Sequence, residues 1–256
     1  MTQPILQIRD LIRGFGALRA VDGVTLDIAP GTITGLIGPN GAGKSTVFEL
    51  ISGGLKPQSG EIVFDGKRID GLSPDRIFRA GLARTFQIPR PFPRMTVLEN
   101  AMLAPCDQPG ERFWNNWVRG GAVARAERMA RDKAMGLLEF TGLAAKADEL
   151  AGVLSGGQQK LLELARVLMV EPRLILLDEP AAGVNPALLE DIIERIATLH
   201  ARGIGFLIVE HNMDMVARLC RPVIVLAQGR VIFEGEPDAL RRDPRVLDAY
   251  LGEVAA

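Results

Sequence analysis

The stretch GPNGAGKST occupies residues 38–46 and fits the pattern G-x-x-x-x-G-K-S/T from Gly38 to Ser45. It follows an apolar run, GTITGLIG, and precedes STVFELISGG, which has a helical pattern closed by a glycine pair. A glycine-rich turn between a strand and a helix lets backbone N–H groups approach an anion, and the helix N-terminus favours negative charge. The stretch therefore predicts a phosphate-binding loop within an α/β fold rather than a chance glycine turn.

This loop predicts ATP and Mg²⁺ as ligands. Its backbone N–H groups would surround the β-phosphate, Lys44 would add a charge toward the β- and γ-phosphates, and the Ser45 hydroxyl would ligate Mg²⁺. The predicted nucleotide-binding residues here are Gly38, Pro39, Asn40, Gly41, Ala42, Gly43, Lys44, Ser45 and Thr46.

Two later strand ends carry polar residues that suit ATP hydrolysis. In RLILLDEP, Asp178 would hold the Mg²⁺ shell, and Glu179 would orient or deprotonate the attacking water. His211 ends FLIVEH, where a side chain of a parallel sheet reaches the ligand crevice and could bond the γ-phosphate. Glu179, His211 and Lys44 are therefore predicted catalytic residues. The alternatives are ordinary acids at a strand end and a structural histidine.

Two further residues have weaker signals. Gln87, in ARTFQIP, is predicted as a further catalytic residue that binds the metal or the attacking water through its amide and senses their presence. A polar residue at the joint between two parts of the fold is the alternative. Phe15, in a GFG loop, is predicted to stack on adenine, with a buried core aromatic as the competing interpretation.

A second glycine-rich stretch, LSGGQQK, begins at Leu154 and supplies Ser155, Gly156, Gly157 and Gln158 as further nucleotide-binding candidates. It has N–H donors and a hydroxyl but no lysine and no acid, so it can complete a phosphate site without building one. It would either fold back over the loop in its own chain or cover the loop of a second chain. The second arrangement satisfies two sites at once in a two-fold, head-to-tail pair.

The patterning places β-type runs at both ends of the chain and helical patterns in the middle. We predict one domain, 1–256, with an α/β nucleotide-binding core in 1–88 and 167–256 and a helical subdomain in 89–166. In the helix QQKLLELARVLM, Leu161, Leu164, Ala165 and Leu168 form one apolar stripe. The formal net charge of −1 gives no basic field that would recruit nucleic acid or anionic lipid, the apolar runs are too short to span a bilayer, and the N-terminus shows no secretion signal. Cys106 and Cys220 have no metal or redox spacing and are expected to be reduced thiols in a cytoplasmic protein.

The stretches GPNGAGKST, LSGGQQK and LILLDEP, with Gln87 and His211, resemble ATP-binding cassette (ABC) ATPases in order and spacing, over essentially the whole chain. Within that superfamily, ARTFQ, MTVLENAM, DEPAAGVNP, VEHNMDMV and VLDAYLG are similar to the ATP-binding subunit of branched-chain amino acid importers. Three departures are Gly156, where the subgroup often has an aromatic residue, Arg221-Pro222, where an acidic residue is common, and the unusually proline-rich stretch IPRPFPR.

The resemblance implies a P-loop NTPase (RecA-like) core with an N-terminal antiparallel β-subsheet and an inserted α-helical subdomain. It also implies that LSGGQ acts in trans, with ATP sandwiched between two cassettes. The implied partners are two transmembrane permease subunits, a second related ATPase subunit and an external solute-binding protein, but no nucleic acid. The implied place is the cytoplasmic face of the inner membrane. An importer for urea, amides or another small polar solute and a DNA-repair ATPase are the alternatives.

The segment IPRPFPRMTVLEN predicts a stiff strip before a helix. Prolines 89, 91 and 93 favour an extended backbone, and Thr96 with Glu99 forms a capping-box pattern. Phe92 and Met95 on this strip would either pack on their own subdomain or dock a short permease helix, as the resemblance implies.

Overall fold

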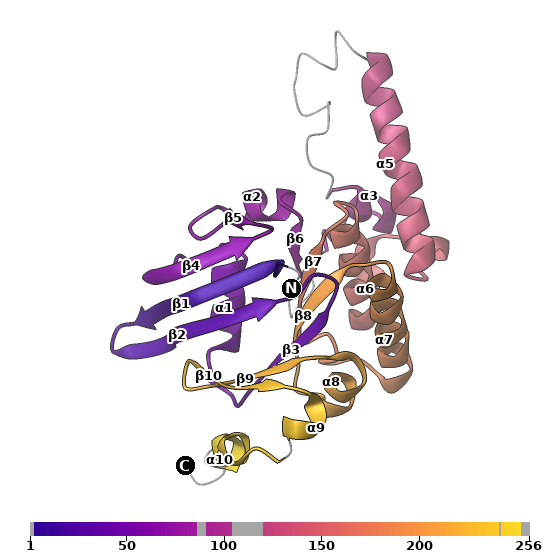
Figure 1. Cartoon of the computed structure of the whole chain (residues 1–256). Coiled ribbons are helices and arrows are strands. Elements are labelled where there is room, and N and C mark those ends of the chain that lie inside the picture. The colour runs from indigo at the N-terminus through magenta and orange to yellow at the C-terminus, as the bar shows by residue number, and fades with distance from the viewer. Residues whose placement is uncertain (1–2, 86–90, 104–119, 241, 252–256) are drawn as a thin grey trace. The chain divides into compact units, whose positions relative to one another are not determined.

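The computed structural model describes residues 3–85, 91–103, 120–240 and 242–251 of the 256. The chain divides into two compact units (Figure 1). The first comprises Met1–Gln87, Pro172–Ala182 and Ile196–Ala256, and the second comprises Ile88–Glu171 and Gly183–Arg195.

The first unit contains a six-stranded sheet with the order β10-β9-β3-β8-β7-β6. Its strands are β3 (Ile33–Ile37), β6 (Leu82–Arg84), β7 (Leu174–Asp178), β8 (Gly205–Val209), β9 (Val223–Ala227) and β10 (Arg230–Gly235). All neighbours are parallel except β9 and β10, which form an antiparallel hairpin. Every residue of β3, β7 and β8 is buried, as expected for central strands covered on both faces.

A second sheet in this unit is antiparallel and has the order β2-β1-β4-β5. Its strands are β1 (Leu6–Phe15), β2 (Leu18–Ile28), β4 (Ser59–Phe64) and β5 (Lys67–Arg68). Phe15 is the last residue of β1, whereas the sequence suggested a loop there. Antiparallel pairing extends the strand to the hairpin turn, where Phe15 pairs with Leu18.

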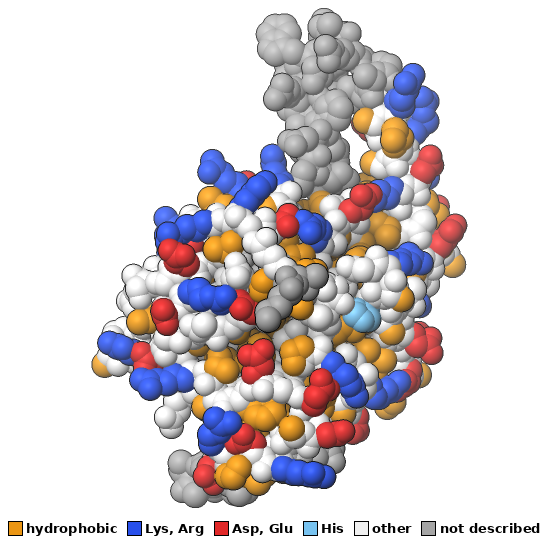
Figure 2. All heavy atoms as spheres, viewed as in Figure 1, with side chains coloured by type: hydrophobic (Ala, Val, Ile, Leu, Met, Phe, Trp, Pro, Cys, Tyr) orange, Lys and Arg blue, Asp and Glu red, His pale blue; other side chains and the backbone are white. Residues whose placement is uncertain are grey.

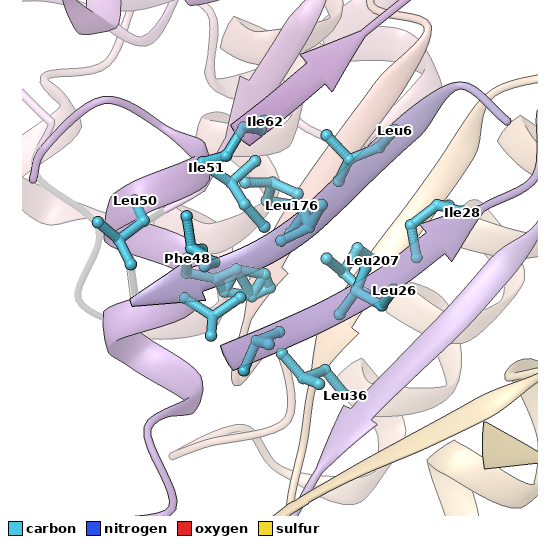
Figure 3. Packing of buried hydrophobic residues seen from close by; sticks show 14 of the residues in the cluster. Leu6, Leu26, Ile28, Leu36, Phe48, Leu50, Ile51, Ile62, Leu176 and Leu207 are labelled. Carbon is cyan, nitrogen blue, oxygen red and sulfur yellow. The ribbon is translucent and has the colours of Figure 1, made fainter. Parts of the chain in front are cut away.

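The core of the first unit lies where α1 (Lys44–Ile51) meets both sheets. Figure 3 shows Phe48 and Ile51 of α1 with Leu6 of the antiparallel sheet and Leu176 and Leu207 of the parallel sheet in one apolar cluster. The remaining helices assigned to this unit are α2 (Pro74–Arg79), α8 (Met213–Leu219), α9 (Pro237–Leu240) and α10 (Pro244–Leu251). Because α1 begins at Lys44, this core fixes the start of the helix that follows the glycine-rich loop.

The second unit is helical. It contains α3 (Val97–Met102), α5 (Gly120–Phe140), two short 3-10 helices (Ala144–Lys146 and Ala151–Val153) and α6 (Gly156–Leu168), while α7 (Pro186–Ala201) runs across the boundary between the units. The predicted apolar stripe of α6 is confirmed, since all four of its residues are buried. The Thr96–Glu99 capping box is also present at the start of α3.

The predicted fold class is confirmed by this architecture and by its structural neighbours, described below. Several short elements were not predicted. They include the helices α2, α8, α9 and α10, the two 3-10 helices, and the three-residue strand β6, which pairs in parallel with β7 at the edge of the sheet.

Candidate functional site

The glycine-rich loop joins β3 to α1, and it folds around the side chain of Lys44. The Lys44 ammonium Nζ donates to the carbonyl oxygens of Gly38 at 2.7 Å and Pro39 at 2.9 Å. The lysine is 6% exposed, so its charge lies inside the loop rather than in bulk solvent. This geometry places a buried cation at the positive end of α1, which suits a phosphate.

Two glycines allow this loop to pack closely on its neighbours. Gly38 has φ 149° and Gly43 has φ 102°, both in the region that favours glycine. A Cβ atom would lie 2.0 Å from the Leu226 carbonyl oxygen at the first position and 2.2 Å from the Ala20 carbonyl oxygen at the second. The loop therefore rests directly on the backbones of β9 and β2.

The turn between β9 and β10 also holds the loop. The Gly229 N–H donates to the Ala42 carbonyl at 3.0 Å, and the Asp22 N–H donates to the Gly229 carbonyl at 2.8 Å. The Asp22 carboxylate accepts hydrogen bonds from Arg19 and from Arg230, which hold the pKa of that carboxyl below its usual range. The loop, β2 and the β9–β10 hairpin thus form one hydrogen-bonded structure.

Phe15 is 46% exposed, which excludes the interpretation as a buried core aromatic. The Arg13 guanidinium carbon lies 5.0 Å from the centroid of its ring. The hairpin that carries Phe15 continues into β2, whose Ala20 backbone contacts the glycine-rich loop. An exposed ring backed by a cation offers a surface for stacking a planar group.

Asp178, the last residue of β7, lies in a network with Arg84 of β6. The Arg84 guanidinium donates to the Asp178 carboxylate at 3.0 Å and also contacts Glu49 at 2.8 Å and the Ser52 hydroxyl at 3.0 Å. The side chains of Arg84 and Asp178 are 10% and 8% exposed. Arg84 therefore joins the end of β7 to α1, the helix that carries Lys44 and Ser45. Sequence reasoning missed it, because its partners are distant in the chain.

Glu179 follows Asp178 and lies beside His211. The Nε2 atom of His211 is 3.3 Å from the Glu179 carboxylate oxygen Oε1. Glu179 has φ 48°, a left-handed conformation that is uncommon for a residue with a side chain and is found at functional sites. The Glu179 N–H donates to the Val209 carbonyl at 2.9 Å, so pairing with β8 fixes this backbone.

The glycine-rich loop, the acids after β7 and His211 lie at the same edge of the sheet because β3, β8 and β7 are adjacent and parallel. Their carboxyl ends lie at one edge of the sheet, where ligands bind in open α/β folds. The glycine-rich loop follows β3, Asp178 and Glu179 end β7, and His211 follows β8. Gln87 lies outside the described residues.

The LSGGQ segment, residues 154–158, belongs to the second unit. Ser155 caps α6: its hydroxyl accepts from the Gln158 N–H at 3.3 Å, and the Gln158 side chain accepts from the Ser155 N–H at 3.0 Å. This capping box was not predicted, although the S-x-x-Q spacing is its sequence signal. Gly156 is exposed and a Cβ there would meet nothing, whereas a Cβ at Gly157 would lie 1.9 Å from Leu188 Cδ2. Gly157 thus permits close packing against α7.

The proline-rich strip is fastened by Asn100, which is fully buried in α3. Its side chain accepts from the Phe92 N–H at 2.8 Å and donates to the carbonyls of Phe92 and Thr96 at 3.0 and 2.9 Å. The Phe92 ring is nevertheless 52% exposed. In its described part, from Pro91 onward, the strip is therefore held by its backbone, and it presents an aromatic side chain to the surface. It turns between Phe92 and Met95, where the Met95 N–H donates to the Phe92 carbonyl at 3.1 Å, instead of staying extended as the prolines predicted.

Residues 3–85, 91–103, 120–240 and 242–251 contain no group of three or more His, Cys, Asp or Glu side chains that could hold a metal ion. Oxygen donors such as Ser45 and Asp178 suit Mg²⁺, which is usually held by one or two carboxylates together with substrate phosphates. Within the described part of the chain, no helix has both the length and the apolar character needed to cross a membrane.

Comparison with known proteins identifies two matching families. Residues 21–182 match the family described as ABC transporter, and residues 230–256 match the family described as branched-chain amino acid ATP-binding cassette transporter.

Individual relatives match over the whole length. The chain is 40% identical over 256 residues to a probable branched-chain amino acid transport ATP-binding protein LivG of Methanocaldococcus jannaschii, covering 98% of this chain and 99% of that protein. It is 40% identical over 255 residues to a high-affinity branched-chain amino acid transport ATP-binding protein, BraF of Pseudomonas aeruginosa, covering 99% and 100%. A solved ADP conformation of an ATP-binding cassette is 38% identical with a TM-score of 0.82, covering 98% of this chain and 100% of that chain.

Proposed function

The chain belongs to the ATP-binding cassette family of ABC transporters, and we propose that it hydrolyses ATP to drive the import of branched-chain amino acids. The observation that carries the ATPase chemistry is the edge of the parallel sheet, where the buried Lys44, the Asp178 carboxylate and the Glu179–His211 pair follow adjacent strands. The full-length relatives and the family match at residues 230–256 support branched-chain amino acids as the solute.

ATP binds with its β-phosphate in the loop of residues 38–46. The Lys44 ammonium, now bonded to two loop carbonyls, is buried at the N-terminus of α1 and reaches the β- and γ-phosphates from inside the loop. Adenine stacks on the exposed ring of Phe15, which the Arg13 guanidinium also contacts.

Mg²⁺ fits the donor set of this edge. The Ser45 side chain is exposed in the first turn of α1, and the Asp178 carboxylate ends β7, so both offer oxygen atoms. An ion held there would supply positive charge that offsets the negative charge of the phosphates. Gln87, which lies outside the described residues, is proposed to contact this ion or the attacking water.

Hydrolysis then follows from the Glu179–His211 pair. The Glu179 carboxylate orients a water and takes its proton while the water oxygen bonds to the γ-phosphorus and the bond to the bridging oxygen of ADP breaks. His211 steadies this carboxylate from 3.3 Å and contacts the γ-phosphate. The left-handed backbone of Glu179 directs its side chain from the end of β7.

A second cassette completes the site in our proposal. The segment Ser155–Gln158 of one chain covers the glycine-rich loop of another. The Ser155 hydroxyl uses a lone pair for the capping bond from Gln158, so its hydrogen can be donated to a phosphate oxygen. The capping box holds the hydroxyl at the N-terminus of α6, where the helix dipole favours an anion.

The proposed partners are two transmembrane permease subunits, a second related ATPase subunit and, through the complex, an external solute-binding protein. The chain would lie at the cytoplasmic face of the inner membrane. The exposed Phe92, on a strip that Asn100 fastens, supports a docking surface for a permease helix. No nucleic acid partner is proposed: the net charge is −1, and acidic and basic side chains are interspersed on the face shown in Figure 2.

Transport in proteoliposomes tests the proposal. The chain is reconstituted with its permease subunits, companion cassette and external receptor, and ATP-dependent uptake of leucine is compared with uptake of urea. We expect leucine uptake, lost when Glu179→Gln replaces the wild-type chain. Uptake of urea alone would assign the other solute class, and the absence of any ATP-dependent uptake would contradict import.

A further inference from the structure

Glu210 lies between β8 and His211 and has no part in the mechanism above. The residue is 3% exposed, although it is ionisable. Among the residues that the structure describes, no ion pair involving Glu210 is found. A carboxylate this deeply buried is costly unless hydrogen bonds satisfy it, so the identity of its donors is informative.

Three backbone N–H groups supply these hydrogen bonds. Oε1 of Glu210 accepts from the Ala181 N–H at 2.7 Å. Oε2 accepts from the N–H groups of His211 at 2.7 Å and Asn212 at 2.8 Å. The two oxygens of one carboxylate therefore serve two different loops, one following β7 and the other following β8.

Both loops carry residues of the proposed hydrolysis step. Ala181 is two residues after Glu179, whose carbonyl accepts from the Ala182 N–H at 3.1 Å. Asn212 caps α8 through the Met215 N–H at 3.0 Å, so the second loop is held on its far side as well. Between these fixed points, the Glu210 carboxylate joins the backbones of the two loops, in addition to the side-chain contact between His211 and Glu179.

We propose that Glu210 is a positioning residue that locks the loop of Glu179 and the loop of His211 into one geometry for hydrolysis. This inference rests on the proposed function, because it assigns Glu210 a role through those two residues. The β7–β8 ladder, including the bond from the Glu179 N–H to the Val209 carbonyl, does not involve the Glu210 side chain. Loss of the carboxylate should therefore release the loops without dissolving the sheet.

The surroundings of Glu210 make its hydrogen bonds strong. The pKa of the nearby Cys220 thiol is raised to about 12. Burial is the largest cause, the negative charge of Glu210 is the second, and Arg221 has a smaller opposite effect. An N–H donor bound to a carboxylate in such poorly hydrated surroundings forms a stronger bond than one between neutral groups.

The variant Glu210→Gln tests the link because an amide has one acceptor oxygen and one donor group. The oxygen is expected to face the two N–H groups of His211 and Asn212, which leaves the amide NH₂ against the Ala181 N–H. Two donors cannot bond each other, so the Ala181 amide should be released selectively. Glu234→Gln, at an exposed position on β10, removes the same charge and is the matched control.

Three measurements on the full chain separate positioning from general destabilisation. Residue-resolved amide hydrogen exchange by NMR should be faster at Ala181 by roughly tenfold or more, since a charge-assisted bond is lost, with His211 and Asn212 little changed. ATP affinity should remain that of the wild type, because the glycine-rich loop is untouched. The kcat for ATP should fall by roughly 10–100-fold, the effect of a misplaced catalytic group.

Normal kcat with a released Ala181 amide would overturn the proposal, as would unchanged exchange at Ala181. If Glu210→Gln fails to fold, amide exchange in the wild-type chain still tests the proposal. An Ala181 amide that exchanges at the rate of an unprotected amide would refute the link. Glu179→Gln is measured in parallel. If that variant keeps normal turnover, the proposed function is wrong, which is a different result from a normal Glu210→Gln.

Discussion

The imidazole Nε2 of His211 lies 3.3 Å from the carboxylate Oε1 of Glu179, although 32 positions separate the two residues in the sequence. The contact arises because β7 and β8 are parallel neighbours and each residue stands just beyond the end of its strand. The pair thus faces the ligand edge of the sheet as a unit.

Glu179→Gln should keep ATP binding and lower kcat by roughly 10²–10⁴-fold, because an amide cannot take the proton of the attacking water. Nucleotide affinity is measured with a fluorescent ATP analogue and turnover by phosphate release. Glu127→Gln, at an exposed position on α5, is the control and should behave as the wild type. Near-normal turnover in Glu179→Gln would remove this residue from the catalytic step.

Ser155→Arg should leave ATP affinity of the isolated chain intact and abolish ATPase activity, because the bulky charge blocks closure of the signature segment over the partner's nucleotide. Lys44→Ala protein should lose activity for a different reason, the missing phosphate contact. A mixed dimer contains one site with both lesions and one with neither, so mixing should restore part of the activity. Mixed dimers that form and remain inactive would contradict an arrangement in trans.

Removal of the Arg84 guanidinium should destabilise the fold strongly. Arg84→Met leaves the nearly buried Asp178 carboxylate without its cation and should lower the free energy of unfolding by about 3 kcal/mol. The exposed pair Arg9–Asp27 is the control, and Arg9→Met should cost below about 1 kcal/mol. Urea unfolding measures both, and a double-mutant cycle with Asp178→Asn should show coupling. Equal losses in the free energy of unfolding for the two arginine substitutions would contradict a stabilising role of the buried Arg84–Asp178 pair.

Phe92→Asp should leave folding and ATP affinity of the isolated chain near normal, because the ring is 52% exposed. Assembly with the permease should weaken greatly, since burying an unpaired charge at the contact costs several kcal/mol. Co-purification with the permease measures this loss, and Met129→Asp, at an exposed apolar position on α5, should assemble normally. If Phe92→Asp unfolds the isolated chain, the docking assignment is wrong.

The two glycines of the signature segment should differ in their tolerance of alanine. Gly157→Ala places a methyl group against Leu188 and should cost about 1–3 kcal/mol of stability. Gly156→Ala projects into open space and should change stability by no more than about 0.5 kcal/mol. Thermal or urea unfolding distinguishes them. Equal costs would show that Leu188 moves aside freely.

Sequence patterns predicted most of the fold because the decisive signals are local. The glycine-rich loop, the apolar runs of β7 and β8, and the Thr96 capping box each lie within a few consecutive residues. The strand β6 was missed because three residues give no periodicity, and its pairing with β7 is a tertiary contact.

The same limit applies to the site. Lys44, Asp178, Glu179 and His211 were identified as single residues at element ends, whereas Arg84 and Glu210 act through partners 94 and 29 positions away. No pattern in one sequence states which backbone N–H groups a buried carboxylate will meet.

The turn at Gly229 makes the carboxyl-terminal region modular. Its hydrogen bond to Ala42 joins two main-chain atoms, so this contact with the nucleotide loop does not depend on side chains, and among the residues after 229 the Arg230 guanidinium adds its bond to Asp22. The branched-chain family match begins at residue 230. Chimaeras that keep Arg230 and are exchanged after it can therefore vary the carboxyl-terminal region while the nucleotide-binding loop keeps its hydrogen bonds.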